Sequence, residues 1–157
     1  MKTHTYTSHF EWTGNIGKGT QNYTSYERDF LIKILGKPNI KGSSEPSFRG
    51  DATKHNPEDL FLSSISSCHA LWYLHLCASN AIEVLSYEDA AQGKMQENED
   101  GRGHFTAVYL KPQVLIKSTA NIDLAHDLHN KAHEMCFIAN SCNFPIHHQA
   151  KIAAKYS

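Results

Sequence analysis

The stretch that decides the fold is HNPEDLFLSSISSCHALWYLHLC, at residues 55–77. Asn56 is a favourable helix N-cap, Pro57 suits the first helical position, and the two acidic residues that follow complement the positive end of a helix dipole. Neither glycine nor proline interrupts the chain from there to about Asn80. Its apolar residues are too many for one surface stripe. The stretch therefore predicts a long helix that is buried on more than one side.

The segments around this helix predict mostly strands. Residues 4–12 alternate in polarity and residues 14–20 are rich in turn formers, which predicts a hairpin. Residues 36–57 hold three of the five prolines and predict a long irregular connection. The remaining expected elements are strands at 22–35, 81–96 and 104–118, a second helix from Asn121 or Asp123 to about 140, and a closing strand within 144–157. This order predicts one α+β domain over residues 1–157.

Charge and hydropathy exclude several classes of partner. The formal net charge of −1 gives no general electrostatic basis for binding nucleic acid or an anionic membrane. No apolar run approaches the roughly 20 residues that span a bilayer. The first twelve residues, MKTHTYTSHFEW, lack the apolar core of a secretory signal. We therefore expect a cytoplasmic protein.

Two of the four cysteines stand out by position. Cys68 lies ten residues after Glu58 in the first helical run, and Cys136 lies in the second. The chain has no CxxC pair, which argues against a zinc ribbon or a thioredoxin-type motif. A redox cysteine needs a nearby cation that favours its thiolate, and a second thiol that resolves its oxidised form. Two thiols on two helices are compatible with that chemistry.

The chain resembles the OsmC/Ohr family, the osmotically inducible protein C-like and organic hydroperoxide resistance proteins. NPEDLFLSSISSCHA at residues 56–70 is similar to the family's Asn-Pro-Glu helix start ten residues before a reactive cysteine. AHEMCFIANS at 132–141 is similar to its second cysteine motif, and FEWTGNIGKGT at 10–20 to its opening. Arg49 stands at an offset similar to that of the family's arginine. The likeness covers nearly the whole chain.

The resemblance implies a thiol-dependent peroxidase that reduces organic hydroperoxides, and hydrogen peroxide less efficiently. Cys68 would become a sulfenic acid, and Cys136 would resolve it as a disulfide. Arg49 would stabilise the thiolate and the leaving oxygen, and Glu58 would orient its guanidinium. No bound cofactor is implied, because an external dithiol or lipoyl-type reductant restores the thiols. The implied architecture is an intertwined homodimer with long central helices on antiparallel sheets and active sites at the subunit interface.

The residues around Cys68 and the departures from the family pattern qualify this expectation. Apolar neighbours of Cys68 on its helix would make a pocket suited to organic hydroperoxides: Phe61, Ile65, Leu71 and Trp72. Phe137 stands where the family often has proline, and Arg28 competes with Arg49 for the cationic role. Cys77 is expected to be structural, and Cys142 to be a surface or core thiol or a spare resolver.

Two alternative functions stay open at this point. A non-catalytic small-molecule binding protein of the same fold would use the pocket and leave the cysteines inert. A metal-binding protein would use histidines of the second helix, where His126, His129 and His133 precede Cys136 at spacings close to one helical face. Those four groups span about 15 Å along a straight helix, so only some of them could share one ion.

Overall fold

The computed structural model describes residues 1–117 and 121–155, and divides the chain into a first unit, Met1–Leu60, and a second unit, Phe61–Ser157. Each unit is described by itself. Helices and sheets of antiparallel and mixed type are both present, so the predicted α+β class is confirmed. The single domain and the intertwined homodimer stay predictions.

The first unit is built on an antiparallel sheet of three short strands, β1 (His9–Trp12), β2 (Phe30–Lys33) and β3 (Ile40–Gly42), in that order. The hairpin predicted around the turn-rich residues 14–20 is confirmed in its pairing, because β1 pairs antiparallel with β2 beyond that segment; its connection is longer than expected. The ring of Phe30 covers Gly42, where a Cβ would meet it at 2.2 Å. The expected irregular connection contains β3 and the short 3-10 helix η1 (Pro46–Phe48).

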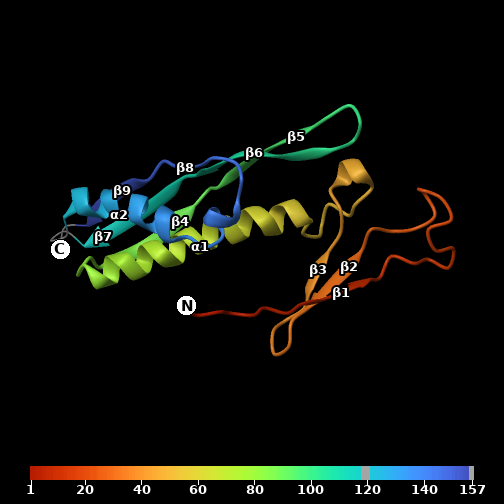
Figure 1. Ribbon diagram of the computed structural model, residues 1–157, viewed down its shortest axis with the longest axis horizontal. Helices are drawn as coiled ribbons and strands as arrows, with labels where there is room; N and C mark the ends of the chain where they lie inside the picture. The colour runs from red at the N-terminus through yellow and green to blue at the C-terminus, as the bar shows by residue number, and fades with distance from the viewer. Residues whose placement is uncertain (118–120, 156–157) are drawn as a thin grey trace. The chain divides into compact units, whose positions relative to one another are not determined.

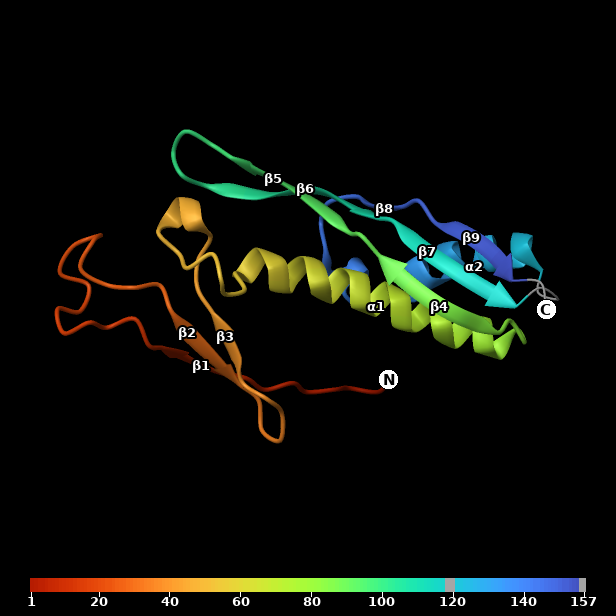
Figure 2. The same cartoon turned by 180° about the vertical axis from the view of Figure 1, so that it is seen from behind.

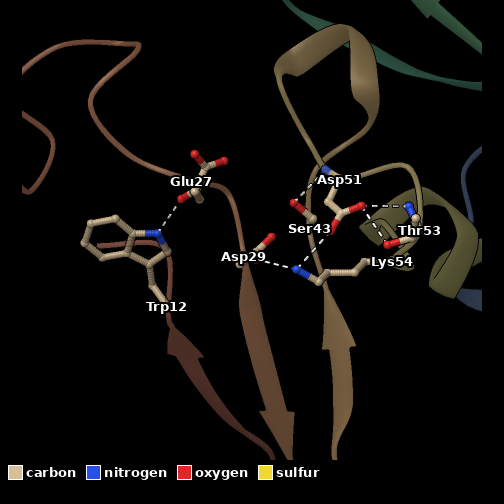
Figure 3. A network of polar contacts seen from close by, with 7 residues as sticks. All are labelled: Trp12, Glu27, Asp29, Ser43, Asp51, Thr53 and Lys54. Carbon is tan, nitrogen blue, oxygen red and sulfur yellow. Dashed lines mark hydrogen bonds and ion pairs between the residues drawn. The ribbon is translucent and has the colours of Figure 1, made fainter. Parts of the chain in front are cut away.

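A polar network holds the loop between β3 and the long helix within this unit (Figure 3). Lys54 forms ion pairs with Asp29, next to β2, and with Asp51, the latter at 3.1 Å. Asp51 also accepts hydrogen bonds from the backbone and hydroxyl of Thr53, which are the largest causes that lower its pKa to about 2. The Ser43 hydroxyl accepts the Asp51 N–H at 3.1 Å. The loop is thus tied to two strands of its own sheet.

The long helix α1 (Pro57–Ser79) begins where the sequence predicts and ends within a residue of the expected end. The Asn56 side chain accepts the Asp59 N–H at 2.7 Å, and the Asp59 carboxylate accepts the Asn56 N–H at 3.3 Å, a reciprocal cap. The buried residues of α1 recur at every fourth position: Ile65, His69, Tyr73 and Cys77. Such spacing gives one buried stripe along the helix.

The strands of the second unit form two mixed sheets of three strands each. One has the order β4 (Val84–Asp89), β7 (Pro112–Lys117), β9 (Lys151–Lys155), and the other β5 (Gln92–Glu97), β6 (Gly103–Leu110), β8 (Ile146–His148). The tail thus supplies two short strands instead of the one expected. Both pair in parallel with earlier strands, β8 with β6 and β9 with β7. Parallel pairing requires a crossover connection, and the second helix lies in it.

That second helix, α2 (Ile122–Met135), begins at Asn121, whose side chain accepts the Leu124 N–H at 3.1 Å. The choice between two start residues is thereby decided. The helix ends earlier than expected, and the short 3-10 helix η2 (Ala139–Ser141) follows. Met135, the last residue of α2, is 36% exposed.

Both helices pack on one face of the strand layer, which Figure 1 shows from the helix side and Figure 2 from the strand side. One core cluster joins α1, α2 and β7 through Tyr73, Cys77, Ala125, Leu128, Ala132, Val114 and Ile116, together with Ile82. A second cluster joins the start of α1 to β6 and β8 through Ile65, Val108, Leu110 and Ile146. In the ranges 1–117 and 121–155, no helix has the length and hydropathy to cross a membrane.

Candidate active site

Cys68 lies in the middle of α1 with a free, half-buried thiol. It directly precedes His69 of the buried stripe, so its side chain is turned away from the centre of the core. A half-buried thiol is shielded from bulk water yet open to a small reactant. That is the exposure a reactive cysteine needs.

Cys136 occupies a different kind of position from the one expected. It is the C-cap of α2, with extended backbone angles of φ −71° and ψ 107°, and its free thiol is fully buried. The prediction that it lies within the helix is wrong, because the chain leaves the helical path after Met135. The backbone N–H of Ala139 points at the Cys136 sulfur at 3.4 Å.

The structure brings the two thiols together. The Cys68 side chain lies close enough to the Cys136 thiol to raise the pKa of that thiol. Burial is the largest cause that raises the pKa of the Cys136 thiol, the nearby Cys68 side chain raises it further, and the Ala139 N–H opposes them. The Cys136 thiol therefore keeps its proton near neutral pH. The redox roles of the two residues stay predictions.

An apolar pocket of about 350 Å³ is lined by residues that lie near Cys68 and Cys136 in the sequence, although neither cysteine lines it. It is lined by Leu71, Trp72, His75 and Phe137. Trp72 lies one helical turn after Cys68, and its ring meets the Phe137 ring edge-on with centroids 5.7 Å apart. The prediction of an apolar pocket is right for Leu71 and Trp72 and wrong for the other two residues. Phe61 and Ile65 instead pack in the core with β6 and β8.

The two candidate arginines of the first unit differ sharply. Arg28 is engaged, since its guanidinium donates to the backbone oxygens of Tyr26 at 2.6 Å and Tyr23 at 2.8 Å and stacks on both rings. Arg49 is exposed, and its side chain has no hydrogen bond or ion pair within the described part of the chain. Its backbone φ of 64° is unusual for a residue with a side chain. This contrast favours Arg49 as the available cation.

Glu58 lies in the first turn of α1, as predicted, among the last residues of the first unit. Arg49 belongs to the same unit, whereas both cysteines belong to the second. The pairing of Arg49 with Glu58 and with Cys68 therefore stays a prediction. The backbone of the Arg49 loop packs tightly on itself, because a Cβ on the next residue, Gly50, would lie 1.5 Å from the backbone oxygen of Ser44.

A buried cluster of histidines lies between the helices that carry the cysteines. His69 Nε2 and His129 Nδ1 are hydrogen-bonded at 3.0 Å, and each side chain is 1% exposed. The ring of Tyr73 stacks on His129 with centroids 3.8 Å apart, and His148 stacks on His69 at 5.5 Å. The sequence interpretation missed His69 as part of a site. Its signal is its place four residues from both Ile65 and Tyr73 on the buried stripe.

The expected metal face of α2 does not form. His126 is exposed, whereas His129 is buried against α1, so the two rings lie on different faces. Across residues 1–117 and 121–155, no group of three or more His, Cys, Asp or Glu side chains has a geometry that could hold a metal ion. The described residues therefore give the metal-binding alternative no support.

The buried histidine pair makes the fold sensitive to acid. Burial is the largest cause that lowers the pKa of His69 to about 4 and of His129 to about 3, while an unfolded histidine titrates near 6.5. The unfolded chain therefore binds more protons below pH 6.5, and stability that is complete above that pH is lost towards pH 3–4. At pH 5 we expect each imidazole to lower the free energy of unfolding by about 2 kcal/mol relative to pH 7.5.

Urea unfolding at the two pH values measures this effect. A double variant, His69→Gln with His129→Asn, removes both titrating groups and should reduce the difference between the two pH values. The exposed His104→Gln is the matched control and should leave the difference unchanged. A full acid effect in the double variant would contradict the assignment.

Comparison with known proteins gives one family match. The family model described as OsmC-like protein matches residues 50–151. The matched segment contains Glu58, Cys68 and Cys136, and starts directly after Arg49. The comparison with curated proteins found no match.

Solved structures agree with this match. An OsmC-like protein of unknown function from Vibrio cholerae is 27% identical, with a TM-score of 0.86 over 95% of this chain and 100% of that chain. An organic hydroperoxide resistance protein from Elizabethkingia anophelis is 22% identical, with a TM-score of 0.67 over 99% and 100% of the two chains. A further one, from Legionella pneumophila, is 18% identical, with a TM-score of 0.64 over 97% and 100%. The latter two likenesses show the fold.

Proposed function

This chain belongs to the OsmC-like protein family, and from that premise we propose that it is a thiol-dependent peroxidase that reduces organic hydroperoxides. The observation that carries the proposal is the closeness of two free cysteines, Cys68 half-buried and Cys136 fully buried. The names of the Elizabethkingia and Legionella proteins, which refer to organic hydroperoxide resistance, support the choice of substrate. A purely structural pair of cysteines would not need one partially open sulfur.

In the first step the Cys68 thiolate attacks the terminal oxygen of the hydroperoxide. A sulfur–oxygen bond forms, the oxygen–oxygen bond breaks, and sulfur loses two electrons to the peroxide. The leaving alkoxide takes a proton and departs as an alcohol, and Cys68 is left as a sulfenic acid. Solvent supplies the proton that the alkoxide takes, and Cys136 keeps its own proton during this step.

In the second step Cys136 attacks the sulfenic sulfur. A sulfur–sulfur bond forms, the sulfur–oxygen bond breaks, and water carries away the hydroxyl and the thiol proton. An external dithiol or lipoyl-type reductant then reduces the disulfide by thiol exchange and is itself oxidised to a disulfide. The contact of the two thiols in the reduced protein supports this order, because little movement is needed to join them.

The pocket of Leu71, Trp72, His75 and Phe137 suits the organic part of the substrate. Its aromatic and aliphatic lining can bury an alkyl or aryl group, which hydrogen peroxide lacks.

We propose that Arg49, held by Glu58, supplies the cation at the sulfur, from the same chain or from the partner of a homodimer. An antioxidant role would follow from this activity, and we propose the cytoplasm as its place. The same pocket in a protein with inert cysteines is the competing binding function.

Titration with an organic hydroperoxide separates these functions. One equivalent of cumene hydroperoxide should convert the reduced protein to a species in which mass spectrometry maps a Cys68–Cys136 disulfide. The Cys136→Ser variant should stop at a Cys68 sulfenic acid that dimedone captures. Cys142→Ser is the matched control and should give the same disulfide as the unmodified chain. A protein that keeps four thiols after excess hydroperoxide would contradict the proposed function.

A further inference from the structure

We propose that the buried hydrogen bond between His69 and His129 positions the two redox thiols, by fixing α2 on α1 so that Cys136 lies within reach of Cys68. Its catalytic meaning rests on the proposed function, since it concerns the step that joins the thiols. Neither histidine is proposed to contact the hydroperoxide. They act through the cysteines and are positioning residues.

The chain positions of these contacts carry the argument. On α1 the two contact residues, Cys68 and His69, are neighbours, whereas on the other side His129 and Cys136 are seven residues apart. One turn of α1 therefore contacts α2 at His129 and the residue that follows α2, Cys136. The last two turns of α2 lie between these contacts and are about 10 Å long. A rotation or slide of α2 at the histidine contact is transmitted along those rigid turns to the Cys136 sulfur.

Neighbouring rings restrain the pair from two further positions. Tyr73, one turn along α1 from His69, stacks on His129 with an interplanar angle of 12°. His148 of β8 stacks on His69 and on His129, with centroids 5.5 and 6.0 Å away. Rings from α1, α2 and β8 thus fix the imidazole planes, and this makes the 3.0 Å hydrogen bond directional.

The hydrogen bonding of His69 and His129 shows that the two side chains do more than fill space in the core. A neutral imidazole has one donor and one acceptor nitrogen, so the bond uses one nitrogen of each ring. The other nitrogens, His69 Nδ1 and His129 Nε2, are buried without a partner among the described residues. Leaving such groups unpaired is unfavourable, and apolar side chains of similar size would avoid it. What the imidazoles add is one defined register between the helices.

The test measures how closely the thiols are held, without any peroxide. Equilibration of the protein with reduced and oxidised glutathione gives the effective concentration of Cys136 towards Cys68, with the 68–136 disulfide quantified by mass spectrometry. His129→Asn keeps a polar atom at the place of Nδ1, whereas His129→Gln moves the amide to the place of Nε2, and His129→Leu removes it. We expect the Gln and Leu variants to lower the effective concentration about tenfold, and the Asn variant to stay within about threefold of the unmodified protein.

Thermal melting followed by circular dichroism shows whether all three variants fold. If the Leu variant unfolds, the comparison of the Asn and Gln variants still tests the proposal. Equal effective concentrations in the Asn and Gln variants would overturn the proposal, as would a value in the Leu variant equal to that of the unmodified protein.

A second measurement distinguishes failure of this proposal from failure of the proposed function. With one equivalent of hydroperoxide, the Gln variant should form the Cys68 sulfenic acid and then close the disulfide about tenfold more slowly. Absence of both the sulfenic acid and the Cys68–Cys136 disulfide in the unmodified protein would refute the peroxidase and leave the glutathione result to decide the positioning role.

Discussion

Replacing Cys68 by serine is expected to abolish hydroperoxide consumption, with a loss on the order of a thousandfold or more. A serine hydroxyl is not ionised near neutral pH, and its oxygen cannot accept the peroxide oxygen to give a sulfenic acid. The substitution is nearly isosteric at a half-buried site, so the fold should be retained. The measurement is the consumption of cumene hydroperoxide in the presence of excess dithiol.

The matched control for this experiment is Cys142→Ser. Cys142 is also a half-buried free thiol, and it hydrogen-bonds through sulfur to the Ile138 oxygen at 3.3 Å, which a serine hydroxyl can also do. Turnover by this variant should match that of the unmodified protein. Persistent turnover by the Cys68→Ser protein would end the peroxidase proposal, whereas loss in both variants would point to a general effect of the substitutions on folding.

The second large effect is expected at Arg49. Removing its guanidinium should slow formation of the Cys68 sulfenic acid on the order of a hundredfold, because the cation favours the thiolate and stabilises charge on the leaving oxygen. Arg49→Gly suits this purpose, since the backbone φ of 64° is unstrained for glycine. Arg49→Lys keeps the charge but loses the bidentate geometry of the guanidinium. Its rate of sulfenic acid formation should lie between those of the unmodified protein and of Arg49→Gly. Stopped-flow measurement of the first step under single-turnover conditions gives the rates.

Arg28 provides the comparison for this variant. Its guanidinium is occupied by two backbone oxygens and two tyrosine rings, so Arg28→Lys should leave the rate of the first step nearly unchanged. A slower first step in Arg28→Lys than in Arg49→Gly would exchange the roles of the two arginines.

Features that depend on residues close together in the sequence could be predicted from it. The start of α1 is one, because Asn56 and Asp59 cap each other within a single turn. The class of fold followed from the order of the elements, whereas the pairing of Cys68 with Cys136 came from motifs similar to those of a known family and stays a prediction. These are the parts for which local chemistry or resemblance is sufficient.

The rest depends on contacts between distant parts of the chain. The length of the connection from β1 to β2 was not predicted, because a turn-rich segment does not reveal how far the chain continues before the next strand begins. His69 was overlooked as a site residue, since its partner His129 lies 60 residues away on another helix. The end of α2 at Met135 was also missed, and with it the extended backbone that turns Cys136 into the core. Helical periodicity alone gives no sign of that exit.

The parallel pairing of β8 with β6 and of β9 with β7 has a consequence for how the molecule is made. Both pairings join segments distant in sequence, and α2 lies in the crossover that each of them requires. Ladders of this high contact order close slowly. During biosynthesis the Cys68 segment emerges from the ribosome well before the Cys136 segment and the tail strands. We therefore expect the proposed thiol pair to form late in folding, after the Cys136 segment has been synthesised.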